Sequence, residues 1–207
     1  MSDQLAATTR MSSLPPVPPN WLWENRLPRG KIVLLAGPSG SGKTFLAIDL
    51  AARITTSREF PNTENRKPNT ENCSTESLNS RPGSVLLVTP QEDLLDNIRP
   101  RLHAAQADPD KITSTSELSL ERLKDRIDQL ENLQLIIIDP LFYLVANDHE
   151  TMSPAQKLFD LYQHGYARYV TVLALMSMRP GRGDPLHRIP GIVKIGHYAS
   201  LIYAVSP

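Results

Sequence analysis

Short apolar runs alternate with longer amphipathic stretches along most of the chain. Runs of mostly apolar residues predict buried strands at 31–36, 84–89, 133–138 and 170–176. Apolar residues spaced three or four apart predict helices at 45–54, 93–107, 119–130 and 153–168. Two further apolar runs, 192–195 and 201–205, are interpreted as two more strands, with a hairpin as one arrangement. This alternation favours an α/β layered architecture around a mainly parallel central sheet.

Three of the predicted helices carry additional signals. The apolar residues of 119–130 fall on one face, so this helix is expected to be amphipathic. Pro100 lies inside 93–107 and must either kink that helix or mark a late start. Ser153 followed by Pro154 predicts an N-cap with proline in the first helical position.

The composition fits a globular domain and excludes several other classes. The chain has 207 residues, 40% of them hydrophobic, which is enough for a sizeable core. Lys and Arg number 22, as do Asp and Glu, so a strongly basic nucleic-acid coat is excluded. Cys73 is the single cysteine and excludes an internal disulfide. With no signal-peptide pattern and no apolar run of about 20 residues, we expect a cytoplasmic protein without membrane contact.

Two segments differ in composition from the predicted domain. Residues 1–20 are polar and then proline-rich, which predicts a disordered leader. Residues 57–84 contain a tandem Pro-Asn-Thr-Glu-Asn repeat and few apolar side chains, which predicts a flexible insertion between a helix and a strand. The ordered domain is therefore expected over 21–207, interrupted by that insertion.

The strongest chemical signal is the eight-residue stretch between the first predicted strand and helix. It fits the Walker A pattern at every specified position. Such a loop turns its backbone N–H groups toward phosphate oxygens, and the helix that follows directs its positive end at the same anion. We expect ATP phosphates to contact Gly37, Pro38, Ser39, Gly40, Ser41, Gly42, Lys43 and Thr44.

An acidic residue at the end of a buried strand supplies the second part of such a site. Asp139 directly follows the apolar run 135–138. Its carboxylate, together with the Thr44 hydroxyl, is predicted to hold Mg²⁺. The alternative is that Asp139 only caps the next turn. ATP and Mg²⁺ are thus the expected cofactors.

Several stretches together resemble the RepA-like branch of the RecA-type P-loop ATPases, a hexameric helicase group of the AAA family ATPases. They are 21–23, 27–31, 37–44, 98–102 and 138–144. The resemblance implies a three-layer RecA-like α/β domain that binds and hydrolyses ATP. It further implies assembly into a homo-oligomeric ring and, for some members, action on DNA in replication or recombination.

The chain departs from that family at three positions. Similar proteins carry a catalytic Glu after the second strand, where ungapped counting places Gln91 and a one-residue slip places Glu92. Ser177 stands where relatives have a polar or basic pair, and Ser200 where they have an Arg. Because Gln cannot accept a proton and Ser carries no charge, hydrolysis is expected to be weak or to depend on a partner.

A basic stretch offers a second candidate site. Residues 179–197 carry three arginines and one lysine against a single aspartate, which suggests contact with single-stranded DNA. The alternative is a solvated surface loop. Two alternative functions therefore stay open: a non-catalytic, nucleotide-gated ring subunit and a DNA-binding accessory module.

Overall fold

The computed structural model describes residues 20–61, 81–116, 119–143 and 153–205. Residues 1–19 of the predicted leader, the middle of the predicted insertion and residues 144–152 lie outside these ranges. At its centre is a six-stranded sheet with the order β5-β4-β6-β7-β3-β8, in which every neighbouring pair is parallel. The strands are β3 (Ile32–Gly37), β4 (Ser84–Val88), β5 (Ile112–Thr115), β6 (Leu133–Ile138), β7 (Thr171–Ser177) and β8 (Leu201–Ala204).

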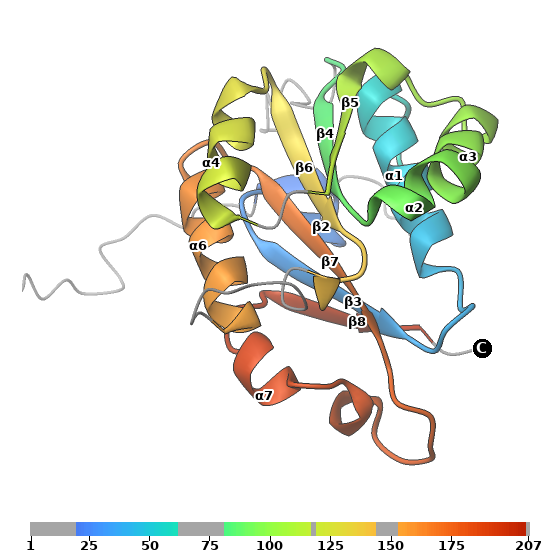
Figure 1. Ribbon diagram of the computed structural model, residues 1–207, viewed down its shortest axis with the longest axis vertical. Helices are drawn as coiled ribbons and strands as arrows, with labels where there is room; N and C mark the ends of the chain where they lie inside the picture. Colours follow the sequence, from blue (N-terminus) through green and yellow to red (C-terminus); the bar gives the residue numbers. More distant parts are fainter. Residues whose placement is uncertain (1–19, 62–80, 117–118, 144–152, 206–207) are drawn as a thin grey trace, which may run out of the picture.

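Helices cover both faces of this sheet and give three layers (Figure 1). One face carries α1 (Lys43–Thr56), α2 (Gln91–Asp93) and α3 (Arg99–Ala104), with a π-helical turn, Leu94–Ile98, between α2 and α3. The other face carries α4 (Leu120–Gln129), α6 (Pro154–Tyr166) and α7 (Ile192–Ile195). The predicted three-layer α/β fold with a mainly parallel sheet is confirmed.

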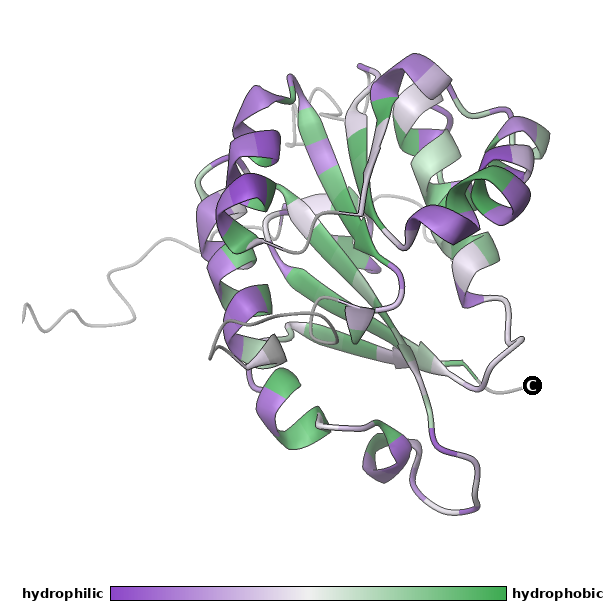
Figure 2. Ribbon diagram, viewed as in Figure 1, coloured by the Kyte–Doolittle hydropathy of each residue, from purple (hydrophilic) through white to green (hydrophobic). Residues whose placement is uncertain are grey.

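Alternating strand residues supply two separate cores. In β3, Ile32, Leu34 and Ala36 pack with α4, α6 and α7, whereas Val33 and Leu35 pack with α1. Because both faces of the sheet are covered, its central strands are apolar at nearly every position rather than at every second one. Figure 2 shows these apolar strands between helices whose outer surfaces are polar.

Most of the predicted elements are confirmed, including their end signals. In α4, Leu120, Leu123 and Ile127 are buried, as the helical spacing predicted. The Ser153 hydroxyl accepts a hydrogen bond from the Gln156 amide at 3.3 Å and caps α6. Pro100 lies in the first turn of α3, directly after the wider π turn, which accommodates a residue that lacks an N–H group.

The interpretation of 192–195 and 201–205 as a hairpin is wrong. Residues 192–195 form α7, in which Ile192 and Ile195 face the core while Val193 is exposed. Gly191, with φ of 69°, starts this turn and accepts the Ile195 amide. A four-residue stretch of three apolar residues and one lysine fits a strand or one helical turn equally well. Strand β8 instead pairs in parallel with β3.

An edge strand of the central sheet and a separate pair of short strands were not predicted. Strand β5 forms one edge of the sheet and has the polar sequence Ile-Thr-Ser-Thr. Strands β1 (Trp21–Trp23) and β2 (Leu27–Pro28) form a separate antiparallel pair. Trp23 stacks on Phe60, with ring centroids 5.5 Å apart. Both elements lack the long apolar run that marks a central strand.

Candidate nucleotide site

The candidate site lies at the carboxyl edge of the sheet, where β3 ends and α1 begins. Gly40 and Gly42 have φ of 78° and 85°, a conformation that a residue with a Cβ adopts only with strain. The turn between them brings the chain from the end of β3 into a helix of 14 residues without an acidic side chain in its first turn. Ser39 and Gly40 are exposed at the tip of the loop. The structure thus has the strand–loop–helix context that a Walker A sequence requires.

The Lys43 side chain folds back onto the loop and donates hydrogen bonds to it. Its Nζ donates to the carbonyl oxygens of Gly37 and Pro38 at 3.0 and 2.8 Å, and to the Ser41 hydroxyl at 3.4 Å. Partial burial lowers the pKa of Lys43, and the charge of Asp139 opposes this shift. The ammonium group therefore lies at the mouth of the loop, where an anion can replace the carbonyl oxygens as its partner.

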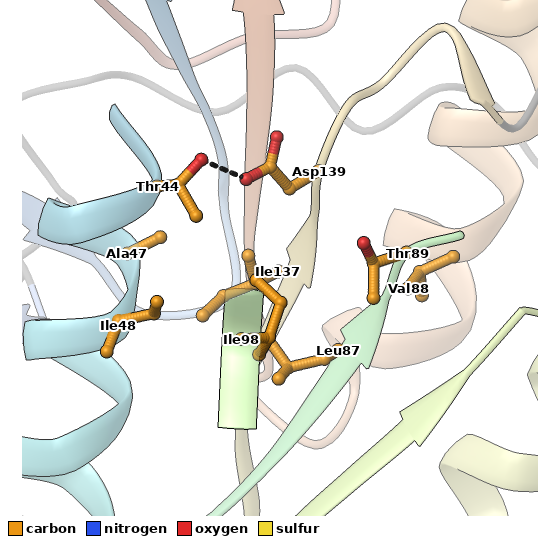
Figure 3. A pocket seen from close by; sticks show the side chains of 9 residues that line it. All are labelled: Thr44, Ala47, Ile48, Leu87, Val88, Thr89, Ile98, Ile137 and Asp139. Atoms are coloured by element: carbon orange, nitrogen blue, oxygen red, sulfur yellow. Dashed lines mark hydrogen bonds between the residues drawn. The ribbon is translucent and has the colours of Figure 1, made fainter. Parts of the chain in front are cut away.

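Thr44 and Asp139 are brought together from positions 95 residues apart in the sequence. The Thr44 hydroxyl donates to Asp139 Oδ2 at 2.6 Å (Figure 3). Burial is the main reason that the pKa of Asp139 is raised; the Thr44 hydrogen bond and the Lys43 charge oppose it. A hydroxyl and a carboxylate oxygen side by side are hard ligands of the type that Mg²⁺ prefers. The donor set therefore fits the predicted metal.

The neighbouring strand adds a side chain that the sequence analysis missed. Asp139 donates its amide to the Val88 carbonyl at 3.0 Å, so the next residue of that strand, Thr89, lies beside Asp139. Thr89 is almost fully buried and, with Thr44 and Asp139, lines a pocket of about 10 Å³. Figure 3 shows its hydroxyl and the Asp139 carboxylate at the same end of that pocket. This volume is close to the minimum for one water molecule, so a nucleotide would lie over the loop and not inside the pocket.

The two candidates for the catalytic position lie close to this pocket but not in it. Gln91 and Glu92 are the first two residues of α2, which begins three residues after the end of β4, and both are exposed. The next residue, Asp93, is only partly exposed, and its charge contributes to raising the pKa of Asp139. Asp93 is thus a third candidate at this edge, and the second acidic one. Asp93 is not found by counting along the sequence, because the family pattern concerns a single glutamate.

The two serine replacements lie at opposite ends of the sheet. Ser177 ends β7 and pairs with Gly37, so it stands beside the phosphate loop. Ser200 precedes β8, and its amide donates to Ile32, the first residue of β3. Gly37 lies five positions after Ile32 in β3, which is about 16 Å at the usual rise. Ser200 therefore lies away from the phosphate loop of its own chain.

The basic stretch leaves the sheet next to the phosphate loop. Met178, which follows β7, donates its amide to the Gly37 carbonyl at 3.0 Å. Beyond it, residues 179–188 form an exposed loop, the basic excursion (Figure 1). Two hydrogen bonds close this loop: the Arg179 amide donates to the Arg188 carbonyl oxygen, and the Arg188 Nε donates to the Arg179 carbonyl oxygen. Arg179 and Arg182 are exposed.

The fold and this arrangement of residues define a P-loop NTPase domain of the RecA-like α/β type. A family model described as an AAA domain matches residues 3–164, and the chain belongs to that family. Membership supports nucleotide binding by a P-loop ATPase. The chain has no match among the curated proteins. Within the described residues, no helix combines the length and apolarity needed to cross a membrane.

Proposed function

We propose that this chain binds Mg²⁺-ATP, with the triphosphate on the loop 37–44 and the metal held by Thr44 and Asp139. The 2.6 Å contact between the Thr44 hydroxyl and the Asp139 carboxylate is the observation that carries this proposal. It joins the residue after the loop lysine to an acid at the end of a fully buried strand, β6. When bound, the metal would neutralise phosphate charge next to these two oxygens.

Hydrolysis is proposed to be slow, or to depend on a partner. Gln91 can orient a water molecule but cannot accept its proton, and Glu92, the alternative, can do both. Ser177 lies beside Gly37 without a charge to stabilise the transferring phosphate. Contacts made equally to ATP and to the transition state give binding without rate. Loss of a charge stabiliser can reduce turnover on the order of a thousandfold.

Phosphate release from the purified chain, measured beside calorimetric titration with Mg²⁺-ATP, tests both parts. The expected result is clear binding with little turnover, and loss of binding in Lys43→Ala. Brisk turnover by the chain alone, abolished in Lys43→Ala, would show that the altered positions do not limit hydrolysis. Binding with no turnover under any condition would favour the nucleotide-gated subunit of a homo-oligomeric ring.

A DNA-binding role is a second candidate, favoured by where the basic excursion begins. The amide of Met178, the residue before it, donates a hydrogen bond to the Gly37 carbonyl oxygen. A nucleotide on the loop and DNA on 179–197 would therefore contact neighbouring segments of the backbone. Arg179 and Arg182 expose their guanidinium groups, whereas Arg188 closes the excursion.

Single-stranded DNA binding with and without ATP tests this candidate. If phosphate contacts carry it, affinity falls steeply with salt and falls further in the double variant Arg179→Gln, Arg182→Gln. Binding that ignores both salt and these substitutions would argue against it.

A further inference from the structure

Phe45 is an exposed aromatic residue at the edge of the phosphate loop. It directly follows Thr44, and 61% of its surface is exposed. Ala47 and Ile48, two and three residues further along α1, are buried in the core. A large ring held in solvent adds nothing to that core, and its position beside the triphosphate loop gives it another use.

Arg101 holds this ring in place from the neighbouring helix. The guanidinium carbon lies 4.5 Å from the centroid of the Phe45 ring, a cation–π contact between α3 and α1. One face of the ring is covered in this way, so its exposure comes from the other face and the edge. The charge of Arg101 also acts on Asp139, where it opposes the rise in pKa that burial causes, so the stacked pair lies within electrostatic range of the candidate metal residues.

A nucleotide anchored by its phosphates must rest its base on the surface around the loop. A base has a flat π face, and flat aromatic or guanidinium surfaces stack on it without regard to sequence or base identity. Phe45 offers such a surface one residue from Thr44, and Arg101 restricts its rotation before any ligand arrives. Pre-ordering of this kind reduces the entropy lost on binding.

We propose that the ring of Phe45, backed by Arg101, is the stacking surface for the nucleobase. This inference rests on the proposed nucleotide site and adds to it the residue that distinguishes a nucleotide from a bare triphosphate. Arg101 acts here as a positioning residue for the ring. Stacking on one aromatic side chain corresponds to roughly a tenfold to hundredfold gain in affinity.

Calorimetric titration of the full chain with ATP and with inorganic tripolyphosphate, both with Mg²⁺, separates base contacts from phosphate contacts. Phe45→Ala is expected to weaken ATP binding about tenfold or more. It should leave tripolyphosphate binding within about twofold of wild type, because tripolyphosphate has no base to stack. Phe45→Tyr should retain ATP affinity, and Arg101→Gln should weaken ATP selectively but less than Phe45→Ala.

Tyr166 provides a matched control, since it is 50% exposed and carries Lys31 5.3 Å from its ring centroid at the opposite edge of the sheet. Tyr166→Ala should leave both affinities unchanged. Equal loss of ATP and tripolyphosphate binding in Phe45→Ala, or no loss of either, would overturn the stacking role. If wild-type protein binds neither ligand, the proposed nucleotide site fails first, and the stacking role fails with it.

Discussion

Ser177 and Gly37 are direct partners in the parallel pairing of β7 with β3. The register therefore places the last side chain of β7 next to the first residue of the phosphate loop. Ser177 is exposed there, and its hydroxyl brings no charge to the loop. In this position a cationic side chain would lie beside the phosphates that the loop is proposed to bind.

Ser177→Arg is accordingly expected to raise the rate of phosphate release. A guanidinium group stabilises negative charge that develops on the transferring phosphate, so we expect roughly a tenfold increase or more. Steady-state phosphate release, at a protein concentration where the chain is monomeric, measures this. Ser200→Arg is the control, because Ser200 lies beside Ile32 at the other end of the sheet and should leave the rate unchanged. Equal rates in wild type and Ser177→Arg would show that charge at this position does not limit turnover.

Asp139→Asn is expected to stabilise the protein in the absence of divalent cations at neutral pH. Burial raises the pKa of Asp139 above its ordinary value of 3.8, so between 3.8 and the raised value the folded state holds a proton that the unfolded state releases. Stability therefore falls as pH rises through this window, and the deficit is complete above it. The neutral asparagine removes the deficit but keeps an oxygen for the Thr44 hydroxyl.

Thermal unfolding as a function of pH, with a chelator present, measures this effect. Asp139→Asn should unfold at a higher temperature than wild type at pH 7, and the two should converge as pH falls to the lower end of the window. Added Mg²⁺-ATP should raise the unfolding temperature of wild type more than that of the variant. A less stable variant at pH 7 would mean that the carboxylate is better stabilised than its burial indicates.

Leu123→Ala tests the packing of α4 on the sheet. Leu123 is 1% exposed, and its removal leaves a cavity in the core beneath α4 and α6. We expect a loss of about 2–5 kcal/mol in the free energy of unfolding, measured with chemical denaturant. Lys124→Ala on the same helix is the control and should change stability by less than about 0.5 kcal/mol. A small effect of Leu123→Ala would indicate that α4 is not docked as described.

The elements that could be predicted from sequence are those whose side chains share one environment. All six residues of β6 are buried, and an apolar run ending in Asp139 marks both the strand and the site residue. The phosphate loop could be predicted equally well, because its turn requires glycines with positive φ and its lysine follows at a fixed spacing. The sequence of 192–195 does not distinguish a strand from a helical turn. Only the packing of these residues against the core shows that they form one helical turn.

The relations across the sheet could not be predicted, because they depend on strand order and register. Thr89 lies beside Asp139 only because β4 and β6 are neighbours in parallel register. Strand order and register also place Ser177 and Ser200 at opposite ends of the sheet, although both are departures from the same family pattern. Asp93 and Arg101 influence the pKa of Asp139 from helices whose packing no local pattern reveals. The chemical type of a side chain can thus suggest a role from the sequence, but only the fold shows which of these side chains lie close together.

Calorimetric titration with Mg²⁺-ATP is the most direct measurement of the central proposal. Wild-type protein should bind ATP, and removal of Mg²⁺ by a chelator should weaken the binding. Lys43→Ala should lose binding, because its Nζ is the cation at the mouth of the loop. Heat signals at the level of dilution for both ATP and ADP at millimolar concentration, with Mg²⁺ present and the protein folded, would contradict a nucleotide site at Lys43, Thr44 and Asp139.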